Sequence, residues 1–182
     1  MYQAIAWRFL YLGLAVGLFV FAFYAGIAIQ LTQEQAEKIK RELGERNQNL
    51  DGFGIFANNV IPALEMFIPA AGVGIGTYAA FSTGQALNAF TMDNPAFDNL
   101  SAFGLLMSPF ALLEIFAYAL GISRSAILAY FLIKKRKSLK EHSNVRQYII
   151  PTVIEIGIVI VILFIGSVIE WQVLSQRNTA AT

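Results

Sequence analysis

Seven polar side chains that could do chemistry interrupt the apolar part of this sequence, and Glu114 is the most informative of them. It lies within an apolar run, residues 103–120, that contains no basic residue. Such a run is typical of a membrane segment, where a carboxylate is costly unless it is protonated, paired or hydrated. The others are Asn58, Asn59, Glu65, Arg124, Glu155 and Glu170.

We expect part of this set to form one intramembrane polar cluster, made of Asn58, Asn59, Glu114, Arg124 and Glu170. Glu114 precedes Arg124 by ten residues, and a helix break at Gly121 would fold the two together. Two interpretations stay open. The cluster could carry a proton, an ion or a lipid headgroup, or it could be a structural pair that fixes helix register.

Familiar catalytic patterns are absent from the sequence. It has neither a Gly-x-Ser-x-Gly elbow nor a phosphate-binding loop. It has no cysteine, and His142 is the single histidine, which argues against a metal site. The glycines of residues 72–76 follow a membrane tract rather than a strand, so they do not indicate a dinucleotide site. We therefore expect a non-enzymatic protein without cofactor or metal.

Composition places the chain among integral membrane proteins. Of its 182 residues, 57% are hydrophobic and 14% are charged, against about 25% charged residues in soluble domains. The net charge of +1 gives no sign of nucleic-acid binding. The apolar run of residues 9–29 is too long for a signal peptide, so we expect an uncleaved first span. The length suits a single domain, residues 1–182.

The apolar tracts predict an all-α, polytopic membrane bundle of about four to five membrane segments, some of them kinked or re-entrant. Spans are expected near residues 7–29 and 149–171, with longer tracts at 55–90 and 102–133. Between the 7–29 span and the 55–90 tract lies a polar excursion, residues 31–54. In it, Thr32 and Gln35 form a capping box for an amphipathic helix. The tail, residues 175–182, is expected to be disordered.

The second tract carries helix-breaking signals and a smooth face. Asn58 or Asn59 is expected to cap a helix with Pro62 in its first turn, and Pro69 should kink that helix. Beyond the kink, a small residue recurs every fourth position, which allows another helix to approach closely. This predicted helix-packing face consists of Gly72, Gly76, Ala80 and Gly84.

Basic residues predict the orientation. Residues 134–148 hold the densest group of lysines and arginines, which retains a loop in the cytoplasm. Arg8 places the N-terminus on the same side, so the 31–54 excursion is extracytoplasmic. The two middle tracts must then cross an odd number of times in total, either through one re-entrant tract or through a hairpin. The expected location is a cell membrane, crossed several times.

Four motifs, in order, resemble the stage II sporulation protein M-like family of membrane proteins. An Asn-Asn entry, residues 55–59, leads into a glycine-rich tract. Ser108-Pro109-Phe110 followed by Glu114 is similar to the family's Pro-His-Gly and Glu element, with the His and Gly replaced. Residues 121–124 resemble its Gly-Leu-Arg segment, and residues 163–175, with Glu170, resemble its closing helix. Together the motifs cover residues 53–175.

The resemblance implies a polytopic, non-enzymatic protein that works with partners in remodelling a membrane. We therefore expect an integral membrane scaffold or membrane-remodelling subunit, in contact with lipid and with other membrane proteins or further copies of itself. The alternatives are a component of a transporter or channel and an auxiliary subunit of a larger membrane complex. In those cases Glu114 and Arg124 would form a buried polar site.

Overall fold

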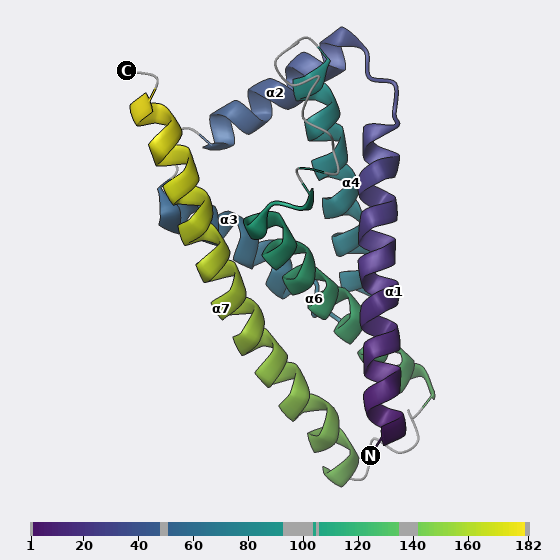
Figure 1. Cartoon of the computed structure of the whole chain (residues 1–182). Coiled ribbons are helices and arrows are strands. Elements are labelled where there is room, and N and C mark those ends of the chain that lie inside the picture. The colour runs from purple at the N-terminus through teal and green to yellow at the C-terminus, as the bar shows by residue number, and fades with distance from the viewer. Residues whose placement is uncertain (1, 48–50, 93–103, 105, 135–141, 181–182) are drawn as a thin grey trace.

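The computed structural model describes residues 2–47, 51–92, 104, 106–134 and 142–180. Over these residues the chain is helical and contains no strand. Its main helices, labelled as in Figure 1, are α1 (Tyr2–Ile27), α2 (Gln33–Asn47), α3 (Gly52–Glu65), α4 (Ala71–Thr91), α6 (Pro109–Lys134) and α7 (His142–Ala180). Residues 135–141 of the predicted basic loop lie outside the described residues, and its residues 142–148 belong to α7. Most of the segment between α4 and α6 also lies outside them.

Three of the described helices are long and apolar enough to cross a membrane. They contain the segments Trp7–Ile27, Pro109–Lys134 and Tyr148–Gln176. This is fewer than the four to five predicted membrane segments. The difference lies in the second tract: α3 has 14 residues, which span only ~21 Å against the ~30 Å of a bilayer core. α4 is longer but carries Thr, Ser, Gln and Asn side chains that lower its mean hydropathy.

The helices form an open bundle in which α6 lies between α1 and α7, and α7 slants across one side (Figure 1). The chain's N-terminus and the junction between α6 and α7 share one end of the bundle. α2 lies across the other end, where the C-terminus also lies. α3 and α4 form a hairpin that starts and finishes at the α2 end.

The predicted cap of α3 and the predicted kink at Pro69 are both wrong. Asp51 caps the start of α3, and its carboxylate accepts a bond of 2.8 Å from the amide of Gly54, so neither Asn58 nor Asn59 is the cap. Pro62 consequently lies inside α3 rather than in its first turn. Pro69 is not inside a helix, because α3 ends at Glu65 and Ala70 has a φ of 66°. A left-handed residue cannot continue the helix.

Two predictions for the last long helices are also wrong: the break in the middle of α6 and the disordered tail after α7. α6 runs unbroken through Gly121, which is buried where an added Cβ would lie 2.9 Å from the Cβ of Met66. Glycine there permits a close helix contact rather than a bend. α7 continues to Ala180, so the tail that was expected to be disordered is helical up to that residue.

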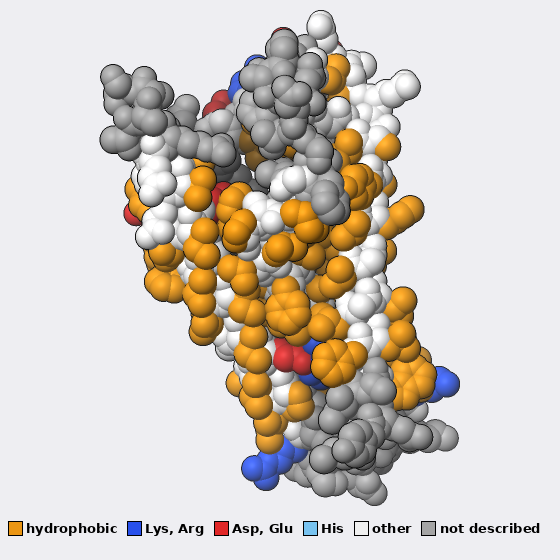
Figure 2. All heavy atoms as spheres, in the orientation of Figure 1, with side chains coloured by type: hydrophobic (Ala, Val, Ile, Leu, Met, Phe, Trp, Pro, Cys, Tyr) orange, Lys and Arg blue, Asp and Glu red, His pale blue; other side chains and the backbone are white. Residues whose placement is uncertain are grey.

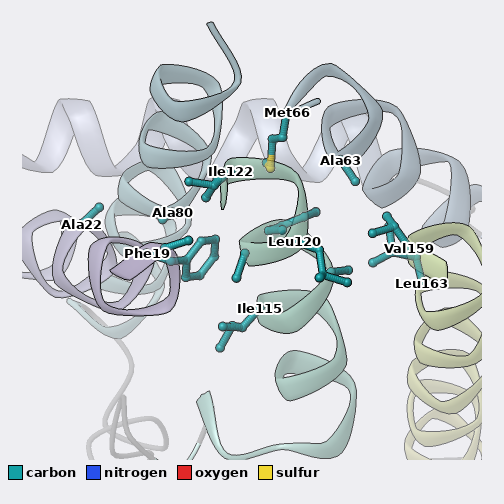
Figure 3. Packing of buried hydrophobic residues seen from close by; sticks show 14 of the residues in the cluster. Phe19, Ala22, Ala63, Met66, Ala80, Ile115, Leu120, Ile122, Val159 and Leu163 are labelled. Atoms are coloured by element: carbon teal, nitrogen blue, oxygen red, sulfur yellow. The ribbon is translucent and has the colours of Figure 1, made fainter. Parts of the chain in front are cut away.

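α6 supplies the centre of the apolar core, and its side chains reach every neighbouring helix (Figure 3). Ile122 points toward the α3–α4 hairpin and Leu120 toward α7, and Ile115 lies further along α6 on the side away from α7. Around them pack Phe19 and Ala22 of α1, Ala63 of α3, Met66 of the hairpin turn, Ala80 of α4, and Val159 and Leu163 of α7. The core thereby fixes α6 against helices from both halves of the chain.

All four residues of the helix-packing face are buried inside the chain. A Cβ on Gly84 would lie 2.0 Å from the carbonyl oxygen of Phe23, and one on Gly26 would lie 2.1 Å from that of Phe81. The backbones of α1 and α4 therefore meet reciprocally at these two glycines. Gly76 meets Ile122 of α6, and Gly72 meets the carbonyl of Met66 in the hairpin turn. The face serves contacts within one chain.

The capping box predicted for the polar excursion is confirmed. The side chain of Gln35 accepts a bond of 2.9 Å from the amide of Thr32, and the hydroxyl of Thr32 accepts one of 3.3 Å from the amide of Gln35. These bonds start α2 at Gln33. Ala36 is buried against the bundle, where α2 packs on the end of α4.

Candidate functional site

Two arginines and one glutamate from three different helices form an ion triad (Arg8, Arg124 and Glu155). From α1, Arg8 donates from Nε to Oε1 of Glu155 at 2.9 Å and from Nη2 to Oε2 at 2.8 Å. From α6, Arg124 donates from Nε to Oε2 at 2.8 Å and from Nη2 to Oε1. Each oxygen of the α7 carboxylate thus accepts from both guanidinium groups. Paired N–H donors make this the geometry of a strong, oriented ion pair.

Ser123 completes the polar cluster. Its hydroxyl accepts a bond of 2.6 Å from Nη1 of Arg8 and donates to the carbonyl of Ala119 at 2.6 Å. The side chains of Arg124, Glu155 and Arg8 are 7%, 13% and 22% exposed. Among the described residues, no buried polar side-chain atom lacks a partner. Arg124 is therefore the most buried member of the triad, and Arg8 is the most exposed.

Two members of the triad lie well within the apolar part of the bundle, while Arg8 is the second residue of the α1 membrane segment, Trp7–Ile27. Glu155 is seven residues after Tyr148, where the α7 membrane segment starts, and Arg124 is ten residues before Lys134, where that of α6 ends. Seven helical residues correspond to ~10 Å. Exposed apolar side chains continue beyond the triad on both helices: Tyr130, Leu132, Ile133, Ile149, Ile150, Val153 and Ile154.

The molecular surface agrees with this depth. On the face shown in Figure 2, hydrophobic side chains cover the middle of the molecule, and most acidic and basic ones lie near its ends. One group of acidic and basic atoms is the exception, since hydrophobic side chains enclose it in the lower half of the view. Charged groups at such a position are expensive unless they are paired.

The triad is paired but not neutral. Two guanidinium groups share one carboxylate, which leaves a formal charge of +1 on the cluster. The described basic residues at the same end, Lys134 and Arg146, are exposed and add positive charge. This end of the bundle is therefore electropositive, and the triad carries that charge into the apolar region.

Glu114 has different partners from those predicted. It is half-buried on α6 and hydrogen-bonds to Tyr118, one turn along the same helix, with Glu170 of α7 as its nearest charged neighbour. Because α6 is unbroken, Glu114 and Arg124 are separated by ~15 Å of helix. Arg124 pairs with Glu155 instead. The predicted single cluster is therefore two separate groups at different depths.

The asparagines are not part of either group by hydrogen bonding. Asn58 and Asn59 are half-buried on α3, and within the described residues neither bonds to Glu114 or Arg124. Glu65 is exposed at the end of α3. Glu170 approaches Glu114 but lies far along α7 from Glu155. Of the predicted cluster, the structure brings together only Glu114 and Glu170.

Sequence reasoning missed Arg8, Ser123 and Glu155 as members of the main site. From the sequence, Arg8 serves only to orient the N-terminus, and Glu155 is named only as a polar residue in the apolar part of the sequence. A usable signal was present, since Arg8 and Glu155 lie toward the starts of their spans and Arg124 lies in the second half of its span. With the predicted orientation, all three side chains approach the same membrane face with opposite charges.

No known protein family matches the chain, and neither the curated proteins nor the solved structures that were compared with it contain a match.

Proposed function

We propose that this protein is a non-enzymatic membrane-remodelling or scaffold subunit that acts through its uneven cross-section in the bilayer. The observation that carries the proposal is the α3–α4 hairpin, which enters and leaves at the α2 end of the bundle. The side-chain amide of Asn88, near the end of α4, donates to the carbonyl of Ile29 at 2.6 Å, just after α1. Gly52, at the start of α3, lies beside Trp171 near the end of α7.

The tip of the hairpin stops inside the apolar region. The hydroxyl of Ser125 on α6 donates to the carbonyl of Ile68 in the turn at 2.6 Å. From Ser125 to the end of α6 at Lys134, the helix continues for nine residues, or ~14 Å. The turn itself, residues 67–71, is apolar. A turn of this composition, with apolar helix surface beyond it and only 14 residues in α3 before it, supports a re-entrant hairpin rather than two complete crossings.

A re-entrant hairpin makes the bundle wider in one leaflet than in the other. On the α2 side of the hairpin tip, α3, α4 and the first half of α6 lie beside α1 and α7, whereas of the described helices only the rest of α6, α1 and α7 extend beyond the tip (Figure 1). With a helix diameter of ~10 Å, two additional helices add roughly 150 Å² to one leaflet. A wedge of this shape favours membrane that is convex on its wider side.

The orientation of the wedge follows from the basic residues. Lys134 and Arg146 are exposed at the narrow end, and a loop rich in lysine and arginine favours the cytoplasm. The wide end and α2 then face outward. A remodelling role is also what the resemblance to stage II sporulation protein M-like proteins implies, and contacts of exposed α7 side chains with partner proteins would serve a scaffold.

Vesicle curvature tests the proposal without knowledge of a partner. The chain has no cysteine, so Glu37→Cys places one thiol on exposed α2 at the wide end, and Lys134→Cys places one at the narrow end. Each variant is reconstituted into small, highly curved vesicles and into large ones, and then labelled with an impermeant reagent. We expect the accessible fraction of Glu37→Cys to rise in small vesicles and that of Lys134→Cys to fall. An accessible fraction that does not depend on vesicle size contradicts the wedge.

One observation favours a second candidate, a component of a transporter or channel. The hairpin breaks at bilayer depth, and Ser125, which bonds to the break, is adjacent to Arg124. Broken helices beside charged groups are the geometry of many transporter sites. For this candidate we expect reconstituted protein to pass ions or protons at a rate that Arg124→Gln alters. Vesicles as tight as protein-free ones would leave the wedge as the better account.

A further inference from the structure

We propose that the ion triad binds the phosphate of an anionic phospholipid headgroup in the leaflet at the narrow end. The first argument is charge. Arg8 and Arg124 share the single carboxylate of Glu155, so the cluster has a surplus of one positive charge among the described residues. A surplus charge surrounded by apolar side chains is costly, and an anion that reaches it removes that cost.

The second argument is access. Arg124 is enclosed between helices, whereas Arg8 is the most exposed member of the triad. Trp7, the residue before Arg8, is 59% exposed on the same helix. Tryptophan is typical of the level where headgroups meet hydrocarbon. The open edge of the triad therefore faces lipid. A guanidinium at that edge has N–H groups suited to phosphate oxygens.

The third argument is the surroundings. Exposed Lys134 and Arg146 lie at the same end of the bundle, and basic groups at a membrane surface concentrate anionic lipids there. Basic pockets between membrane helices on the cytoplasmic side are typical headgroup sites. Lipid binding at this position stands apart from the wedge, because it needs the triad but not the re-entrant hairpin.

Lipid retention and thermal stability test the site. Wild-type protein is placed in nanodiscs of phosphatidylcholine alone, or with added phosphatidylglycerol, and bound lipid is counted by native mass spectrometry. We expect one phosphatidylglycerol to be retained per chain and the unfolding midpoint to rise. In Arg8→Gln the preference should fall roughly tenfold or more, as expected for a lost charge-assisted hydrogen bond, which exceeds the roughly fivefold effect of one basic group at a membrane surface.

Arg146→Gln is the matched control, since it removes an exposed charge at the same end and leaves the triad intact. Equal losses in the two variants would overturn the proposal, because the preference would then come from general surface charge. Inorganic phosphate added to phosphatidylcholine nanodiscs should have no effect, and stabilisation equal to that by phosphatidylglycerol would also overturn it.

Arg8→Gln is expected to fold, because Glu155 keeps its bonds to Arg124. If it does not fold, the wild-type measurement decides. Retention of one phosphatidylglycerol per chain in preference to phosphatidylcholine supports the site, and equal retention of the two lipids overturns it.

Discussion

Gly84→Ala is the substitution whose effect follows most directly from the coordinates. It adds one methyl group at the crossing of α1 and α4, 2.0 Å from the carbonyl oxygen of Phe23, whereas ordinary contacts begin near 3.4 Å. The helices would have to separate by about 1.4 Å. The obstacle is backbone, so a rotamer change cannot relieve it.

The cost can be bounded from the packing. A gap of ~0.5–1 Å already loses a quarter to a half of a dispersion contact, and the opposite side of this crossing, at Gly26, is equally tight. Overpacking of this kind costs about 1–3 kcal/mol. Between membrane helices no hydrophobic drive compensates, because association depends on packing itself. We therefore expect Gly84→Ala to lower the free energy of unfolding by about 1–3 kcal/mol.

Gly74→Ala is the matched control on the same helix. Nothing lies within 4 Å of a Cβ at Gly74, and alanine is the better helix former by up to about 1 kcal/mol. Gly74→Ala should therefore equal or exceed the wild type in stability. Both variants can be unfolded by increasing the fraction of denaturing detergent in mild micelles, with tryptophan fluorescence as the signal. Equal stability of the two variants, or a gain in Gly84→Ala, would refute the close backbone contact.

Three further predictions use the same protein. Glu155→Gln should lower the free energy of unfolding by about 3–5 kcal/mol, because the buried guanidinium of Arg124 and the half-buried one of Arg8 lose their counter-charge; a cost as small as that of a surface ion pair would show that the triad is not buried. Tyr118→Phe should cost about 1 kcal/mol through its lost bond to Glu114, and a double-mutant cycle with Glu114→Leu should show that the two effects are not additive. In intact cells, Glu37→Cys should react with an impermeant thiol reagent and Lys134→Cys only after permeabilisation, and the reverse pattern would invert the proposed orientation.

The two buried polar groups show how far local pattern carries a site prediction. Glu114 was correctly identified as a carboxylate inside an apolar helix, because that depends on the residues beside it in the sequence. Its partner was not, although Tyr118 has a phenolic O–H donor four residues further on, the spacing at which helical side chains meet. Arg124 was expected to bend back to Glu114. Because α6 is unbroken, Arg124 instead pairs with Glu155 of the neighbouring helix α7.

Composition and hydropathy by themselves predicted a helical chain, because lipid leaves each backbone group only internal hydrogen bonds, and three described helices are apolar enough to cross a membrane. Local chemistry also determined the start of α2, through the reciprocal bonds of Thr32 and Gln35. Tertiary structure decided the rest. Whether Pro69 kinks a helix or follows its end depends on the turn that α6 supports through Ser125. Which acid meets Arg124 depends on how α1, α6 and α7 converge, and that convergence is fixed by long-range packing that no single stretch of sequence contains.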